Sequence, residues 1–295
     1  MATGLLKRRY TDDVAMAGQL DALVSPTLKC LREQWWDPNF AEFLRETLRP
    51  RPGTRILDVG CGEGTATLSL GRLQISQVAL FAIDRRLERV KQTFASASGH
   101  NIRVKVAAAD AGALPFRSDV FDSTFCVAVL QHVREVGQAV AELARVTKPG
   151  GRIVAIEPDN AARYWFSSLE SGQTAYEQGA LFFAEALRTR GDVTDPSVGP
   201  KLTSFFAAVG LEPLSVNLFP VSVAQMGPPP AAVWKGRREA VRRSLEGLDD
   251  PRVRKLADQY LAQLDRYVQD VTKAGTAFVE IQNTMLFAAV GQKPE

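Results

Sequence analysis

The sequence predicts an α/β fold with a doubly wound, mainly parallel sheet, and two observations support this. Between residues 54 and 157, short apolar runs alternate with stretches of helical periodicity. Strands that alternate with helices pair in parallel, and the helices cover both faces of the sheet. Two more apolar runs follow at 214–219 and 283–290, so we expect seven strands in all.

The elements of this core can be assigned in chain order. Five buried strands are expected at 55–59, 78–83, 102–107, 123–130 and 152–156. The helices of the core are expected at 65–73, 86–97, 136–146 and 200–208. Turn signals, such as the Lys-Pro-Gly-Gly sequence at 148–151, separate them.

Three segments lie outside this alternation. Residues 1–50 have helical periodicity, which predicts an N-terminal helical cap before a main domain at 51–295. Within the main domain, 159–199 and 221–276 are insertions, and the second contains an amphipathic stripe from Val253 to Val271. Insertions on an α/β core commonly build a substrate chamber, and we expect an acceptor lid here. Simple packing of the stripe onto the sheet layer is compatible with that role.

Composition excludes several classes of protein. The 295 residues contain 36 lysines and arginines against 33 aspartates and glutamates, and this net charge of +3 does not indicate a nucleic-acid or acidic membrane partner. No apolar run reaches the roughly 18 residues of a membrane span, and the N-terminus lacks a secretory apolar core. Three cysteines and two histidines predict neither a disulfide framework nor a metal site. We therefore expect a soluble, cytoplasmic protein without a metal.

A glycine loop is the most informative local feature. The first strand runs into Gly60, Gly62 and Gly64 at alternate positions, and a helix follows. Glycine suits a sharp reversal with positive φ and lets a ligand approach the backbone without meeting a Cβ. The free N–H groups at the start of the next helix can receive a carboxylate or phosphate.

Nearby residues narrow the choice of ligand. Asp84 ends the next strand, 20 residues after Gly64, where an acid can bind ribose hydroxyls. A dinucleotide loop needs glycine at position 65, which is Thr65 here. Asp58 precedes the loop, where it would repel a pyrophosphate but would suit an ammonium group. The expected ligand thus has an amine, a carboxylate and a ribose.

S-Adenosylmethionine has these features, and the sequence resembles the class I methyltransferases, particularly the small-molecule, ubiquinone/menaquinone-methyltransferase-like group. Five segments at normal spacing carry the resemblance: Asp58 to Gly64, Asp84, Ala109-Asp110-Ala111 with Leu114-Pro115-Phe116, Phe121 to Val133, and Arg145 to Gly151. They cover 54–157, and the helix–strand–strand ending extends the likeness to the C-terminus. The resemblance implies a seven-stranded, Rossmann-like sheet with an antiparallel last strand.

The same resemblance implies roles on the methionine side of the cofactor. The backbone of Gly60, Cys61 and Gly62, in the loop closed by Gly64, would pass beneath the methionine part. Asp58 would lie near the amino group. Cys61 is interpreted as a small loop filler rather than a reactive thiol.

On the nucleoside side, the resemblance implies that Asp84 binds both ribose hydroxyls and that Arg85 lies beside the adenine. The Asp110 carboxylate would accept from the adenine amine, and the Ala111 N–H would donate to the ring. Val127 would line the sulfonium pocket through its backbone. Two plainer interpretations stay open: Arg85 as a solvated loop charge, and Asp110 as a turn cap.

Methyl transfer from a sulfonium is an in-line displacement with an activated leaving group. The enzyme must align the acceptor, exclude water and, for a protonated acceptor, provide a base. Ligands of open parallel sheets bind at the carboxyl ends of the strands. His132 follows the fourth strand and is the best-placed titratable group, either as a base or in a positioning role.

The acceptor is expected beside charged and aromatic residues from two parts of the chain. Glu157 begins the segment after the fifth strand that we expect to face the acceptor. The candidate contacts are Asp159, Arg163 and Tyr164 in this segment, and Tyr10 and Trp35 in the N-terminal cap. Such a chamber favours a small, flat, partly apolar molecule, although the aromatics could equally pack as core.

Other functions stay open. Amino-methylating nucleic-acid enzymes usually carry an Asn/Asp-Pro-Pro-aromatic motif after strand four, where this chain has Val-Leu-Gln-His at 129–132. A protein methyltransferase, a non-catalytic S-adenosylmethionine-binding regulatory or partner protein, and a dehydrogenase are the remaining alternatives. The sequence indicates neither the acceptor atom nor the oligomeric state.

Overall fold

The computed structural model describes residues 36, 38–73, 75–159, 164–191, 195 and 197–295. The described residues form two compact units. The sheet unit comprises Trp36–Pro158, Val198–Phe219 and Leu286–Glu295. The helical unit comprises the described parts of Asp159–Ser197 and Pro220–Met285. The cap and domain boundaries expected from the sequence stay predictions.

The strands form one sheet in the order β3-β2-β1-β4-β5-β8-β6, with β7 also paired to β8. Their bounds are β1 Arg55–Val59, β2 Ala79–Asp84, β3 Val104–Ala108, β4 Phe121–Val127, β5 Thr147–Asp159, β6 Trp165–Ser167, β7 Glu212–Met226 and β8 Val279–Gln292. Strands β1 to β5 pair in parallel, and β8 runs antiparallel to β6. The predicted α/β fold is confirmed. The sheet has eight strands rather than seven, because the three residues of β6 are too few to show a periodicity.

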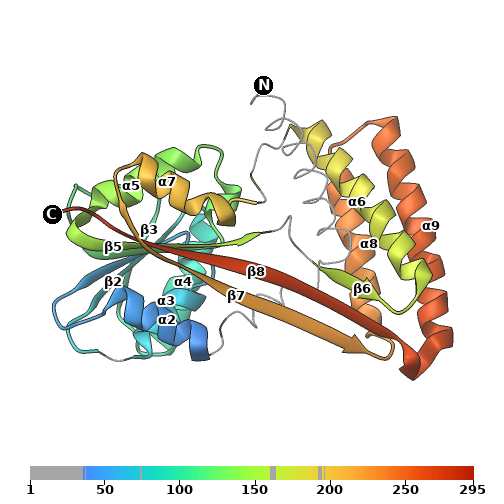
Figure 1. The fold of residues 1–295 in the computed structure, drawn as a ribbon, viewed down its shortest axis with the longest axis horizontal. Coiled ribbons are helices and arrows are strands. Elements are labelled where there is room, and N and C mark those ends of the chain that lie inside the picture. The colour runs from blue at the N-terminus through green and yellow to red at the C-terminus, as the bar shows by residue number, and fades with distance from the viewer. Residues whose placement is uncertain (1–35, 37, 74, 160–163, 192–194, 196) are drawn as a thin grey trace. The chain divides into compact units, whose positions relative to one another are not determined.

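Helices cover both faces of the sheet unit. They are α2 Pro38–Leu48, α3 Thr65–Gly71, α4 Leu87–Gly99, α5 Val136–Val146 and α7 Leu202–Ala208, with the 3₁₀ turns η1 Leu130–His132 and η2 Gly199–Lys201. Helices α2, α3 and α4 lie on one face, and α5 and α7 pack together on the other (Figure 1). The core contains Leu57, Phe121, Val140, Ile153 and Phe206. Buried parallel strands explain the continuous apolar runs of the sequence.

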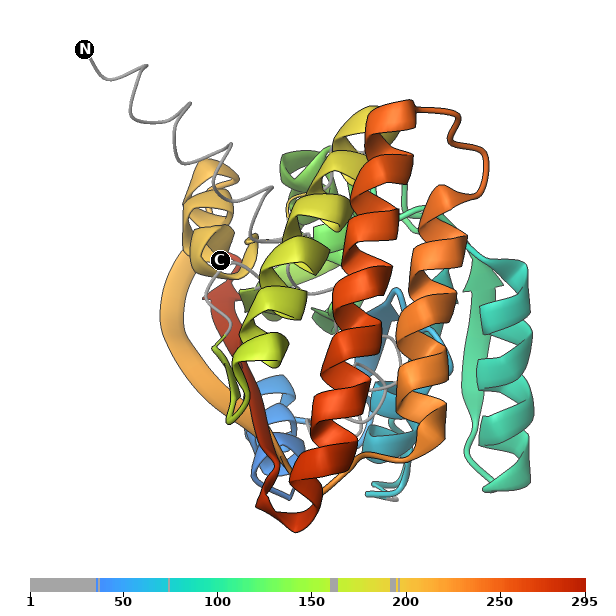
Figure 2. The same cartoon turned by 90° about the vertical axis from the view of Figure 1, so that its right-hand side faces the viewer.

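The helical unit has its own core. Helices α6 Glu170–Arg190, α8 Ala231–Leu245 and α9 Pro251–Ala274 lie side by side, with α9 between the other two in Figure 2. The 3₁₀ turn η3 Gly275–Ala277 follows α9. At the start of α9, Asp250 accepts from the backbone N–H groups of Arg252 and Val253, a typical N-cap.

The amphipathic stripe of α9 is buried, mainly against α6 and α8, and Tyr267 also contacts Trp165 of β6. Val253, Ala257, Tyr260 and Leu264 belong to a cluster formed with α6 and α8. The two predicted insertions therefore pack against each other and make one unit. Sequence periodicity shows that a helix has an apolar face, but it does not show which element covers that face. No helix in the described ranges has the length and apolarity to cross a membrane.

Candidate functional site

Glycine occurs at three positions of the loop after β1 for different structural reasons. Gly60, Gly62 and Gly64 have φ angles of +76°, +56° and +86°. A Cβ on Gly60 would lie 2.3 Å from Cγ2 of Val129, and one on Gly64 would lie 2.9 Å from Cγ2 of Thr93. A Cβ on Gly62 would meet nothing within 4 Å, while the Thr93 hydroxyl donates to the Gly62 carbonyl at 2.9 Å. Protein packing thus requires glycine at 60 and 64, whereas the space beside Gly62 is open.

The loop is anchored to the end of β2. The N–H groups of Gly60 and Cys61 both donate to the carbonyl of Ile83 at 2.8 Å. The N–H of Gly62 donates to Oδ2 of Asp84 at 3.1 Å. The backbone of this loop is therefore held in one conformation by two consecutive residues of the neighbouring strand.

Asp84 lies at the junction of three strand ends. Its Oδ1 accepts from the N–H of Arg86 at 2.9 Å, and its carbonyl accepts from the N–H of Ala109, just after β3. The residue is half-buried, so part of the carboxylate surface stays available to a ligand. The neighbouring Arg85 is exposed.

Asp58, which ends the apolar part of β1, points into the protein interior. It is 3% exposed, and its Oδ2 accepts from the hydroxyl of Thr67 at 2.6 Å. Burial raises the pKa of Asp58 to about 7, partly opposed by the hydrogen bonds from Thr67 and reinforced by the charge of Asp84. The predicted contact of Asp58 with a ligand ammonium group stays a prediction.

Cys61 is buried, and burial raises the pKa of its thiol to about 12. Its Sγ lies 3.5 Å from the hydroxyl of Thr93. A thiol with such a pKa is not a nucleophile at neutral pH, which agrees with the loop-filler interpretation.

The segment after β3 is a compact turn. Oδ1 of Asp110 accepts from the N–H of Gly112 at 2.7 Å, so this side chain does cap a turn. The amide of Gln138 donates to the Gly112 carbonyl at 2.8 Å and connects the turn to α5. Ala111 is half-buried against the apolar core. The adenine contacts of Asp110 and Ala111 stay predictions.

The segment after β4 contains an unusual backbone conformation. Val127 ends the strand and is half-buried, and its predicted contact with the sulfonium stays a prediction. Ala128 follows with φ of +55°, a left-handed conformation that costs a residue with a Cβ. Its N–H donates to the carbonyl of Ile156 at 2.8 Å, which helps to hold it.

Glu157 lies elsewhere than expected. The sequence places it facing the acceptor, but the side chain is fully buried. Its Oε1 accepts from the N–H groups of Val129 and Leu130, both at 2.7 Å, and its Oε2 accepts from that of Gln131 at 3.3 Å. The strand continues past Glu157 to Asp159, so this residue lies within a buried strand rather than in the segment after it.

The remaining candidates belong to both units, His132 to the sheet unit and Asp159 and Tyr164 to the helical unit. His132 is exposed at the end of η1, and its N–H donates to the Val129 carbonyl. Asp159 is buried and accepts from the hydroxyl of Ser197 at 2.7 Å. Tyr164 is 55% exposed, and its N–H donates to Oδ1 of Asn283. Their catalytic and acceptor roles stay predictions, and Tyr10, Trp35 and Arg163 lie outside the described residues.

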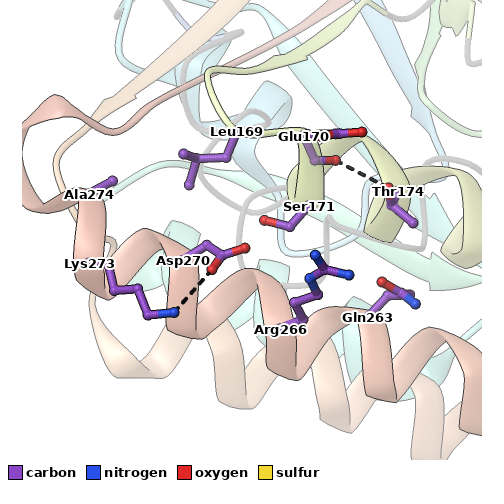
Figure 3. A pocket seen from close by; sticks show the side chains of 9 residues that line it. All are labelled: Leu169, Glu170, Ser171, Thr174, Gln263, Arg266, Asp270, Lys273 and Ala274. Atoms are coloured by element: carbon purple, nitrogen blue, oxygen red, sulfur yellow. Dashed lines mark hydrogen bonds and ion pairs between the residues drawn. The ribbon is translucent and has the colours of Figure 1, made fainter.

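The helical unit has a pocket of about 480 Å³ between α6 and α9 (Figure 3). Its charged lining residues balance, since Glu170 and Asp270 are opposed by Arg266 and Lys273. Asp270 and Lys273 also pair with each other at 3.6 Å. None of the predicted site residues lines this pocket, and its charges select neither a cation nor an anion. The described residues contain no acid, histidine or cysteine cluster that could hold a metal.

The strand ends form one connected part of the α/β sheet unit. Hydrogen bonds and packing contacts connect them in series: the glycine loop bonds to β2, Asp84 bonds to the segment after β3, and Val129 packs on Gly60. An acid at the end of the second strand and an open backbone at Gly62 fit the ribose and the methionine part of S-adenosylmethionine. This is the arrangement expected of a class I methyltransferase domain.

Comparison with known sequences agrees with this class. Residues 57–155 match the methyltransferase domain family. The chain is 33% identical over 135 residues to demethylmenaquinone methyltransferase of Mycobacterium marinum, covering 46% of this chain and 53% of that protein. It is 34% identical over 124 residues to the ubiquinone/menaquinone C-methyltransferase UbiE of Geotalea daltonii, covering 41% and 52%. Residues 57–155 therefore match a methyltransferase domain, and this part of the chain is similar to methyltransferases of the ubiquinone/menaquinone type.

The sequence matches cover only part of each protein. The chain spans about half the length of these two curated relatives, and the matches cover less than half of this chain. Solved structures show the fold alone: YcgJ of Bacillus subtilis has a TM-score of 0.52 at 19% identity, covering 86% of this chain and 98% of that one. The [4+2]-cyclase SpnF has a TM-score of 0.51 at 19% identity, covering 94% of both chains.

Proposed function

We propose that the whole chain is an S-adenosylmethionine-dependent methyltransferase whose acceptor is a small, partly aromatic or apolar metabolite. The observation that carries this proposal is the bond between the N–H of Gly62 and the carboxylate of half-buried Asp84. It holds together an open glycine backbone and a ribose-binding acid, which are the two features that this cofactor requires. The domain match at 57–155 supports the same reaction.

Different residues would bind different parts of the cofactor. When bound, S-adenosylmethionine supplies a methyl group on a sulfonium, which is already an activated leaving group. Asp84 would accept from the ribose hydroxyls, and its two bonds to backbone N–H groups orient the carboxylate beforehand. The Gly62 backbone would receive the methionine part, since no side chain occupies that space. Asp110 and Ala111 would contact the adenine.

Proton transfer is needed only if the acceptor is protonated. His132 is exposed and follows the strand-four segment, so its ring can exchange protons with solvent and with an acceptor. We propose it as a base or as a positioning residue. Asp159 and Tyr164 are proposed to contact the acceptor, with Asp159 held by Ser197.

Charge and relatives support a small acceptor. A net charge of +3 gives little attraction to a polyanion. The similar demethylmenaquinone methyltransferase is named for a small quinone-type molecule. Location in the cytoplasm and the absence of a nucleic-acid substrate are part of the proposal.

Calorimetry with S-adenosylmethionine and S-adenosylhomocysteine tests the cofactor, and transfer of an isotope-labelled methyl group tests the reaction. We expect binding of both molecules and transfer to members of a panel of neutral phenols and quinols. Transfer only to DNA, RNA or protein would overturn the acceptor class. Binding without transfer to any acceptor would favour a non-catalytic binder, and the SpnF likeness shows why the fold does not decide this question.

A further inference from the structure

The carboxylate of Glu157 is a buried charge that binds three consecutive backbone N–H groups. They belong to Val129, Leu130 and Gln131, which follow β4 and start the 3₁₀ turn η1. The N–H groups at a helix start have no partner within the helix, and a carboxylate is their strongest natural acceptor. Glu157 therefore determines the path of the chain after β4.

This segment depends on an outside support. Ala128 has a left-handed backbone conformation that local preferences oppose for a residue with a Cβ. Its N–H bonds to β5 through Ile156, and the next two N–H groups bond to Glu157 on the same strand. The end of β5 thus holds Ala128 in its left-handed conformation and fixes the start of η1.

The turn contacts the glycine loop directly. A Cβ added to Gly60 would lie 2.3 Å from Cγ2 of Val129, so the Val129 side chain occupies the space beside Gly60. A shift of Val129 would therefore open or crowd the glycine loop. A continuous path runs from the Glu157 carboxylate through the Val129 backbone and side chain to Gly60, and all of it lies within the sheet unit.

We propose that Glu157 is a positioning residue for S-adenosylmethionine, acting through Val129 on both the strand-four turn and the glycine loop. This inference rests on the proposed function, because it assumes that the glycine loop binds the cofactor. In this proposal Glu157 does not itself contact S-adenosylmethionine. The carboxylate acts by fixing the backbone that the cofactor meets.

The test compares two substitutions of Glu157 by calorimetry at a temperature where circular dichroism shows each variant folded. Glu157→Leu removes every acceptor, and we expect its Kd for S-adenosylmethionine to rise about tenfold, which is about 1.4 kcal/mol. Glu157→Gln keeps an oxygen for the N–H groups of Val129 and Leu130. We expect its Kd to stay within about threefold of the wild type, a rescue by the conservative variant.

A matched control lies at the other end of the same strand. Thr147 begins β5 and is fully buried, and its hydroxyl donates to the Leu143 carbonyl at 2.7 Å. Thr147→Val should lower the Tm without changing the Kd. In hydrogen exchange without cofactor, the amides of Val129, Leu130 and Gln131 should exchange faster in Glu157→Leu but not in Thr147→Val.

A double-mutant cycle checks the path through Val129. Val129→Ala should also weaken binding, and the double variant with Glu157→Leu should lose less than the sum, because both act on the same turn. An unchanged Kd in Glu157→Leu, or an equal loss in Thr147→Val, would overturn the positioning role while leaving the proposed function intact. A wild-type protein that binds neither S-adenosylmethionine nor S-adenosylhomocysteine would overturn the proposed function, and this inference with it.

Should Glu157→Leu fail to fold, Glu157→Gln and Val129→Ala decide the question. Val129→Ala should then weaken binding about threefold or more, with Glu157→Gln showing faster exchange only at Gln131, whose bond is the longest of the three. Normal binding in Val129→Ala together with unchanged exchange in Glu157→Gln would overturn the proposal.

Discussion

The sheet unit and the helical unit differ in how completely their buried polar groups are hydrogen-bonded. In the sheet unit, buried Asp58, Thr124 and Glu157 all have hydrogen-bond partners at 2.6 to 2.8 Å. In the helical unit, several buried side-chain atoms have no partner among the described residues, and they belong to Trp165, Ser171, Thr189, Tyr260 and Thr284. The described part of the sheet unit contains no such atom.

This difference shows where the sequence is constrained by polar contacts. A buried hydroxyl without a partner has lost its water and gained nothing in exchange, so it opposes folding. The residues around the glycine loop have little freedom, since each polar group has a specific partner. The helical unit depends more on apolar packing between α6, α8 and α9. The following predictions test that comparison, in order of decreasing effect.

The largest effect is expected in the helical unit, at a buried ion pair between α8 and β8. Arg237 and Glu280 form an ion pair at 2.7 Å with both side chains buried, and Tyr267 donates to the second Glu280 oxygen. Arg237→Met would leave a buried carboxylate without its cation, at a cost of about 3–5 kcal/mol in the free energy of unfolding. Thermal unfolding measures this loss.

The matched control is Arg238→Met, one residue further along α8. Arg238 pairs with Asp265, but both side chains are exposed. This change should cost less than about 1 kcal/mol. Equal losses for the two variants would mean that burial does not set the strength of charge pairs in this unit.

Asp84→Ala is expected to have the largest effect on cofactor binding. Each hydrogen bond to a charged group contributes about 1.5 kcal/mol or more, so losing two bonds from the ribose hydroxyls should raise the Kd about a hundredfold or more. Calorimetry with S-adenosylhomocysteine measures this, and exposed Arg85→Ala is the control with a small effect. Retained affinity in Asp84→Ala would contradict its ribose role.

The glycine loop gives a contrast between stability and binding. Gly60→Ala would place a Cβ against Val129, and such overpacking should cost about 1–3 kcal/mol of stability. Gly62→Ala meets no neighbour, so only its left-handed backbone costs energy, about 1–2 kcal/mol. We expect the ratio of the loss in cofactor affinity to the loss in Tm to be larger for Gly62→Ala than for Gly60→Ala. The reverse ratio would exclude the open space beside Gly62 as the ligand side.

The smallest effect concerns the pH dependence of stability. The pKa of Asp58 is raised in the folded protein, so the folded state binds this proton more tightly than the unfolded state does. Stability contributed by the protonated carboxyl is present below pH 4 and is lost as pH rises through 7. Relative to that of Asp58→Asn, the free energy of unfolding of the wild type should fall by about 1 kcal/mol between pH 6 and pH 8. Denaturant unfolding at several pH values measures it, and parallel curves would show that Asp58 titrates normally.

Much of the sheet unit could be predicted from the sequence. The bounds of β1 and of α5 are those expected, because a buried parallel strand is a continuous apolar run and α5 has a regular apolar face. Strand β7 was predicted at 214–219 but extends over Glu212–Met226. It is largely exposed and contains two prolines, so neither burial nor alternation marks its ends.

The sequence by itself determined the glycine loop, the acid at Asp84 and the order of the core elements. These depend on local properties: glycine conformations, apolar runs and the spacing along consecutive strands. The tertiary structure alone decided that Glu157 turns inward to hold the strand-four turn, that Val129 occupies the space beside Gly60, and that α9 packs with α6 and α8. The physical reason is that each of these is a contact between residues far apart in the chain, and no local pattern specifies which partner a buried carboxylate or an apolar helix face will meet.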